Sequence, residues 1–172
     1  RFSHIYYQAW KPLIAAVHGH VYGAGLAMAL EADIVVAAEN ALFCLPEGKV
    51  NIATPISPFV FGDIPKAIVK EMVFTGKPIN ATRAYELGMI NKIVPQELLL
   101  QTAMEYAQEI CKNTGPLANQ ATKEILWRAK TKDLEQTLEI MQEVGVPVYG
   151  TEDSLESQKA FAEKRSPNWQ AR

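Results

Sequence analysis

The chain has 172 residues, of which 48% are hydrophobic and 21% charged, and its formal net charge is −2. This composition favours one soluble globular domain with a hydrophobic core, and the near-neutral charge argues against a nucleic-acid-binding protein. No apolar run is long enough to span a bilayer, so we expect no membrane partner. Cys44 and Cys111 lie in separate segments, which argues against a disulfide framework and favours a reducing, cytoplasmic location.

Short strands, turns and helices alternate in the first part of the chain. In order, we expect the end of a helix at 1–10, a buried strand at 13–17, a glycine-punctuated turn at 19–25, a helix at 26–31, and strands at 34–38 and 41–44. None of the histidines in this part has a carboxylate or thiol at ligand spacing, so we expect no metal site.

The glycine-punctuated turn stands between a strand and a helix, and three interpretations of it compete. A ligand could approach the backbone there and meet the unpaired N–H groups of the helix start. A dinucleotide site is disfavoured because Asp33 comes too early in the sequence to make the ribose contact. The pair Tyr7-x-x-x-Lys11 resembles that of a short-chain dehydrogenase, but it precedes the glycine turn, whereas in that family the pair follows it. The glycines could also serve only tight strand–helix packing.

Most of the remaining chain is predicted to be helical. After a loop at 45–48 and an irregular proline-rich stretch at 51–58, we expect helices at 65–74 and 81–87, the second capped by Asn80 and ended by Gly88, and then a strand at 89–94. Further helices are expected at 95–112, 116–130, 134–144 and 154–164, with Gly145 and Pro147 breaking the third of these.

A series of different short motifs extends along nearly the whole chain. They are Lys11-Pro12, Gly19, Gly23-Ala24-Gly25, Asp33, Ala41-Leu42-Phe43, Pro46-Glu47, Thr75-Gly76, Ala84 with Leu87-Gly88, and Ala160-Phe161-x-Glu163-Lys164-Arg165. This pattern resembles the crotonase superfamily, the enoyl-CoA hydratases and isomerases. Leu45-Pro46-Glu47 and the ending from Phe161 to Trp169 are most similar to its carnitinyl-CoA dehydratase-like branch.

The resemblance implies an α/β fold with a crotonase-like ββα spiral core at 1–94, followed by a helical trimerisation region at 95–172. In that family a front half precedes the Lys11-Pro12 strand, so the core is expected to be the C-terminal portion only. The implied assembly is a homotrimer or a dimer of trimers.

The resemblance also implies a site for an acyl-CoA thioester. The Ala24 backbone N–H matches one donor of the family's oxyanion hole, whose other donor comes from the front half, and Glu47 matches a catalytic carboxylate. No separate cofactor is implied, because coenzyme A is part of the substrate. The residues expected to contact substrate are Tyr22, Gly23, Gly25, Ala27 and Pro46.

One departure from the family pattern bears on the reaction. Family hydratases commonly have a second glutamate at the position of Ala27, and Glu31 lies one helical turn further on, displaced by about 5 Å. A single carboxylate can move a proton between two carbons, but it is less able to add water. We therefore expect double-bond isomerisation rather than hydration, within fatty acid or related acyl-CoA metabolism. The alternative is a non-catalytic acyl-CoA-binding subunit or a degenerate crotonase-like subunit.

Overall fold

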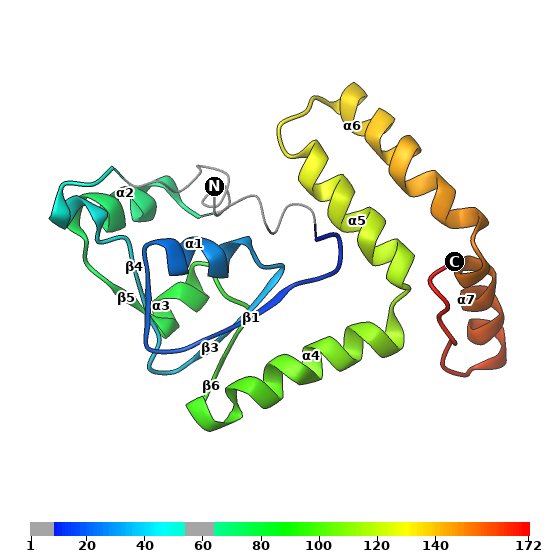
Figure 1. The fold of residues 1–172 in the computed structure, drawn as a ribbon, viewed down its shortest axis with the longest axis horizontal. Coiled ribbons are helices and arrows are strands. Elements are labelled where there is room, and N and C mark those ends of the chain that lie inside the picture. Colours follow the sequence, from blue (N-terminus) through cyan, green and yellow to red (C-terminus); the bar gives the residue numbers. More distant parts are fainter. Residues whose placement is uncertain (1–8, 54–63) are drawn as a thin grey trace. The chain divides into compact units, whose positions relative to one another are not determined.

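A computed structural model describes residues 9–53 and 64–172 (Figure 1). The expected helix end at 1–10, most of the proline-rich stretch at 51–58, and Tyr7 lie wholly or largely outside the described residues. The chain divides into two compact units. Unit 1 comprises residues 13–105, and unit 2 comprises residues 106–172 together with the described residues 9–12.

Unit 1 is built on two small sheets in its described part. Its strands are β1 (Ile14–Val17), β2 (His20–Tyr22), β3 (Ile34–Ala38), β4 (Leu42–Cys44), β5 (Ile79–Asn80) and β6 (Lys92–Val94). One sheet has the order β1-β3-β6 with parallel pairs, and the other has the order β2-β4-β5, in which β5 is antiparallel to β4. Strands β1 and β3 belong to the first sheet, and β2 and β4, which follow them, belong to the second. The order is reversed for the last pair, because β5 joins the second sheet and β6 the first.

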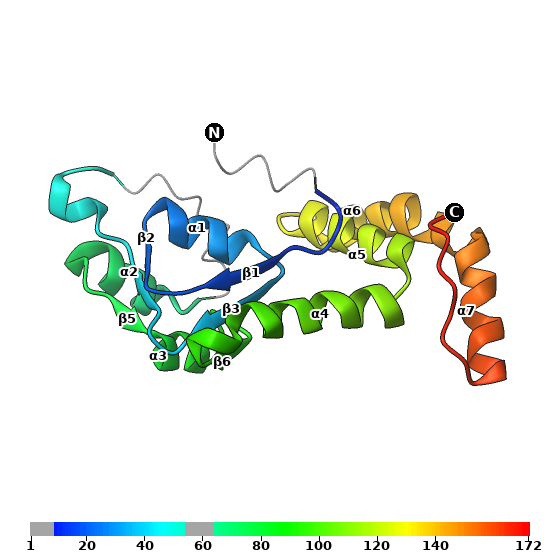
Figure 2. The same cartoon turned by 60° about the horizontal axis from the view of Figure 1, so that its bottom comes forward.

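The helices of unit 1 follow and connect these strands, and α1 and α3 pack against them (Figures 1 and 2). They are α1 (Ala24–Glu31), the 3₁₀ turn η3 (Glu47–Val50), α2 (Lys66–Thr75), α3 (Ala81–Glu86), the 3₁₀ turn η5 (Gln96–Leu98) and the first part of α4 (Leu99–Asn113). Asn80 Oδ1 accepts a hydrogen bond from the Arg83 N–H at 2.8 Å, which confirms the predicted cap of α3. Phe43, Leu26 and Leu45 have no exposed surface and form the centre of the core.

Two predictions in unit 1 were wrong. The stretch at 19–25 contains strand β2, because His20–Tyr22 pairs in parallel with Leu42–Cys44, and only this tertiary pairing stabilises so short a strand. The loop at 45–48 gives way to η3, because the Lys49 N–H bonds to the Pro46 carbonyl at 2.9 Å and closes a tight turn.

Unit 2 is helical in its described residues. It contains the rest of α4, α5 (Pro116–Ala129), α6 (Leu134–Ile140), the π-helical turn η6 (Met141–Gly145), the 3₁₀ turn η7 (Val146–Gly150) and α7 (Glu152–Glu163). The expected break at Gly145 and Pro147 was wrong: the chain stays helical from Leu134 to Gly150 by changing its hydrogen-bond pattern. Pro147 stands in the first turn of η7, where its missing N–H costs little.

The C-terminal segment is tied to α7. The buried Asp153 carboxylate accepts hydrogen bonds from the Gln170 and Ala171 N–H groups at 2.7 and 2.9 Å. Glu156 forms a bidentate pair with Arg165 and also accepts from the Asn168 N–H at 2.8 Å. The charge-assisted bonds from Arg165, followed by the Asn168 N–H, lower the pKa of Glu156 to about 2. Among the described helices, none is long and apolar enough to cross a membrane.

Candidate active site

The candidate site lies at the carboxyl ends of β2 and β4, which run in parallel with Tyr22 opposite Cys44. The Gly23 N–H continues this pairing by donating to the Cys44 carbonyl at 2.9 Å. Helix α1 starts directly after β2, and Glu47 follows β4 by three residues. Because parallel strands end at the same edge, the pairing brings the helix start and the carboxylate together, where ligands commonly bind in such sheets.

Gly23 forms the corner between β2 and α1. It is buried and has φ 54° and ψ −120°, a conformation that a residue with a Cβ rarely adopts. The first hydrogen bond of the helix runs from the Ala27 N–H to the Gly23 carbonyl at 3.1 Å. The N–H of Ala24 precedes that bond and has no acceptor within the helix, while Ala24 and Gly25 are exposed. The helix start therefore offers a backbone donor at the surface of the site.

The Glu47 carboxylate packs against this corner. A Cβ added to Gly23 would lie 2.7 Å from Glu47 Oε1, so the carboxylate stands where a side chain would otherwise be. Glu47 Oε2 is buried and has no hydrogen-bond partner among the described residues. Because buried polar atoms in folded proteins are almost always satisfied, this oxygen is suited to accept a hydrogen bond or a proton from a ligand or water.

The other predicted substrate contacts come from the same elements. Tyr22 is half-buried at the end of β2, with its ring edge-on to that of His20 at a centroid distance of 5.0 Å. Ala27 is half-buried on α1, one turn past Ala24, and Pro46 is half-buried directly before η3. Glu31 is the last residue of α1, and Asp63, the other acid that could stand in for the missing glutamate, lies outside the described residues.

Cys44 lies directly before the site and contacts the end of α2. The sequence analysis considered this cysteine only as a possible disulfide partner. Its side chain is 1% exposed, and its Sγ donates to the Gly76 carbonyl at 3.2 Å. Burial raises the pKa of the Cys44 thiol, so it stays protonated and is unsuited to be a nucleophile. No sequence pattern pointed to this contact, since the two residues are joined only by the fold. Within the described residues, no group of three or more histidine, cysteine, aspartate or glutamate side chains could hold a metal ion.

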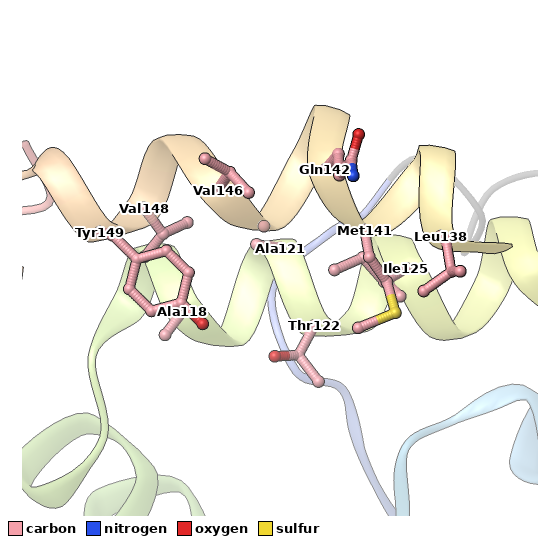
Figure 3. A pocket seen from close by; sticks show the side chains of 11 residues that line it. Ala118, Ala121, Thr122, Ile125, Leu138, Met141, Gln142, Val146, Val148 and Tyr149 are labelled. Carbon is pink, nitrogen blue, oxygen red and sulfur yellow. The ribbon is translucent and has the colours of Figure 1, made fainter.

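A pocket lies wholly within unit 2, between α5 and the helical run from α6 to η7 (Figure 3). Its volume is about 400 Å³, and its lining is mostly apolar, with Ile125, Leu138, Met141 and Val146 among its residues. It contains no carboxylate, thiol or histidine, so we assign no chemistry to it.

The described site thus places a carboxylate beside the start of a helix on a ββα spiral. Groups of these two kinds can, in general, move a proton and stabilise an oxyanion. The family model described as enoyl-CoA hydratase/isomerase matches residues 2–172. The chain therefore belongs to the enoyl-CoA hydratase/isomerase family, and the predicted crotonase-like fold is confirmed.

Individual relatives agree with this assignment. A carnitinyl-CoA dehydratase of Salmonella typhi is 42% identical over 94% of this chain, which confirms the similarity to that branch. The chain spans 64% of the length of that relative. Among solved structures, an enoyl-CoA hydratase from Bacillus anthracis matches 98% of this chain and 66% of its own with a TM-score of 0.92 and 32% identity. One from Mycobacterium tuberculosis H37Rv matches 95% of this chain and 65% of its own, with a TM-score of 0.89 and 36% identity.

Proposed function

We propose that this chain carries the acid–base part of an enzyme acting on an acyl-CoA thioester. The observation that carries the proposal is the Glu47 carboxylate packed on Gly23, beside the first N–H groups of α1. The enoyl-CoA hydratases and carnitinyl-CoA dehydratases that it resembles support a coenzyme A thioester as the substrate.

The chemistry follows from where charge develops. Removing a proton from the carbon next to a thioester carbonyl places negative charge on the carbonyl oxygen. The Ala24 N–H would donate to that oxygen, and one such preorganised donor is worth about 3–4 kcal/mol of transition-state stabilisation. Glu47 Oε2, which is buried without a partner among the described residues, would take the proton and return it to another carbon.

Ala27 favours isomerisation of a double bond over addition of water. Its methyl group leaves Glu47 as the single carboxylate of the two that a hydratase commonly uses, and Glu31 lies at the far end of α1. The names of the dehydratase relatives favour a second candidate, loss or addition of water. Both candidate reactions use Glu47. Addition of water also requires the enzyme to hold a water molecule in position, whereas isomerisation of a double bond does not.

The proposed assembly is a homotrimer or a dimer of trimers, and the proposed location is the cytoplasm. Unit 2 leaves large apolar side chains uncovered: Leu126 is 69% exposed, Tyr149 78% and Phe161 88%. Exposed apolar surface of this kind marks sites of protein association, and it supports contacts between copies of this chain through unit 2.

The decisive experiment is Glu47→Gln in the full-length protein, assayed with trans-2- and trans-3-enoyl-CoA thioesters of several acyl lengths. We expect turnover to fall by about 10²-fold or more, while binding of a thioester measured by calorimetry persists. Glu97→Gln, which changes an exposed glutamate of unit 1, is the matched control. Unchanged turnover in Glu47→Gln would refute the assignment. Binding without turnover in the wild type would indicate a non-catalytic acyl-CoA-binding subunit.

A further inference from the structure

The short turn η3, which begins with Glu47, is seated on the C-terminal end of α2. Gly48 stands so close to α2 that an added Cβ would lie 3.2 Å from the backbone carbonyl oxygen of Val73. That distance is tighter than nine in ten real Cβ contacts, and a helix carbonyl cannot swing aside as a flexible side chain can. The backbone of the turn at Gly48 therefore lies too close to the backbone of the helix to leave room for a side chain.

Gly76 makes two further contacts from the same helix end. It closes α2 in the left-handed conformation, with φ 57°, and its N–H bonds to the Met72 carbonyl at 2.9 Å. Its carbonyl accepts the bond from Cys44 Sγ, three residues before Glu47. Its open face is covered by the aliphatic part of Lys49, since a Cβ there would lie 2.7 Å from Lys49 Cε. The segment that carries Glu47 is thus held to one helix end from both sides of the glutamate.

We infer that the C-terminal end of α2 positions the Glu47 carboxylate, with Gly48, Gly76 and Cys44 as positioning residues. The backbone of η3 is set by α2, and the carboxylate at its start packs on Gly23, so a shift of the turn moves the carboxylate relative to the start of α1. A displacement of about 1 Å in a reacting group can cost about 10²-fold in rate. This inference rests on the proposed catalytic role of Glu47.

The test is Gly48→Ala in the full-length protein, because the added methyl group must push η3 away from the Val73 carbonyl. The shift needed is a few tenths of an ångström, so we expect kcat to fall by about three- to tenfold while KM for the enoyl-CoA substrate stays within about twofold, since the base is displaced and the residues expected to bind substrate are unchanged. Gly150→Ala is the matched control, because a Cβ there meets nothing within 4 Å. A folded Gly48→Ala protein with the kcat of the wild type would overturn the inference.

A second pair of variants decides the question if Gly48→Ala does not fold. Cys44→Ser keeps a donor for the Gly76 carbonyl, whereas Cys44→Ala removes it. We expect Cys44→Ala to lower kcat at least fivefold and Cys44→Ser to restore at least half of that loss; equal kcat values in the two variants would overturn the inference. Failure of the proposed function looks different, because the wild type and Glu47→Gln would then have the same turnover.

Discussion

The Glu47 carboxylate stands 2.7 Å from the point where Gly23 would carry its Cβ. Two separate features of this corner therefore require glycine at position 23. The backbone conformation disfavours a residue with a Cβ, and the carboxylate occupies the space that a side chain would fill. Both requirements act on the same candidate site, because Gly23 also directs the start of α1.

Gly23→Ala should accordingly harm both stability and activity. The unfavourable backbone conformation should cost about 1–3 kcal/mol in the free energy of unfolding, measured by urea denaturation, and the clash should displace Glu47 and lower kcat by 10²-fold or more. Gly88→Ala is the control, since Gly88 has φ 71° but nothing within 4 Å of an added Cβ. A Gly23→Ala protein that loses stability but keeps its kcat would contradict the steric part of this prediction.

Ala27→Glu should raise the rate at which a trans-2-enoyl-CoA is hydrated. Position 27 lies one turn past Ala24 on α1, so a carboxylate there could help Glu47 to hold the attacking water. Orientation of a reacting water is worth several kcal/mol, so we expect an increase of at least tenfold in spectrophotometric hydration assays. Ala27→Gln has nearly the same size without the charge and should show less gain. Fast hydration of crotonyl-CoA by the wild type would show that the single-glutamate argument is wrong.

The attachment of the C-terminal segment should weaken in acid. The pKa of Glu156 is lowered to about 2 by its hydrogen bonds to Arg165 and Asn168, from an ordinary value of 4.5. A lowered pKa means that the carboxylate stabilises the folded state above pH 4.5 and that this stabilisation is lost as the pH falls toward 2. Glu156→Gln should therefore unfold at a lower temperature than the wild type at pH 7, and the difference should shrink by pH 3. Thermal unfolding followed by circular dichroism checks this, and a difference that does not depend on pH would contradict it.

Association through unit 2 should depend on its exposed apolar side chains. Phe161 on α7 is 88% exposed, and Phe161→Glu should shift the full-length protein toward smaller species in light scattering at micromolar concentration. Gln158→Glu adds the same charge at an exposed position of the same helix and should leave the assembly unchanged. A wild-type protein that is monomeric at this concentration would contradict the proposed trimer.

Local sequence signals determined much of this structure. The strand at 34–38 and the capped helix after Asn80 could be predicted because an apolar run and a cap act through neighbouring residues. The candidate residues Ala24 and Glu47 also came from the sequence, through the resemblance of short motifs. The helical continuation through Gly145 and Pro147 could not be predicted, since it depends on a local change from α- to π- and 3₁₀-type bonding.

Only the tertiary structure decided how the site is assembled. His20–Tyr22 becomes a strand because Leu42–Cys44 lies beside it, and this pairing is what brings Gly23 and Glu47 together across 24 positions of the chain. The partners of Glu47 follow from the same fold: Gly23 on one element, and the end of α2 holding η3 on another. Propensity and periodicity act over a few neighbours along the chain, whereas these contacts join residues that are close only after the strands have paired.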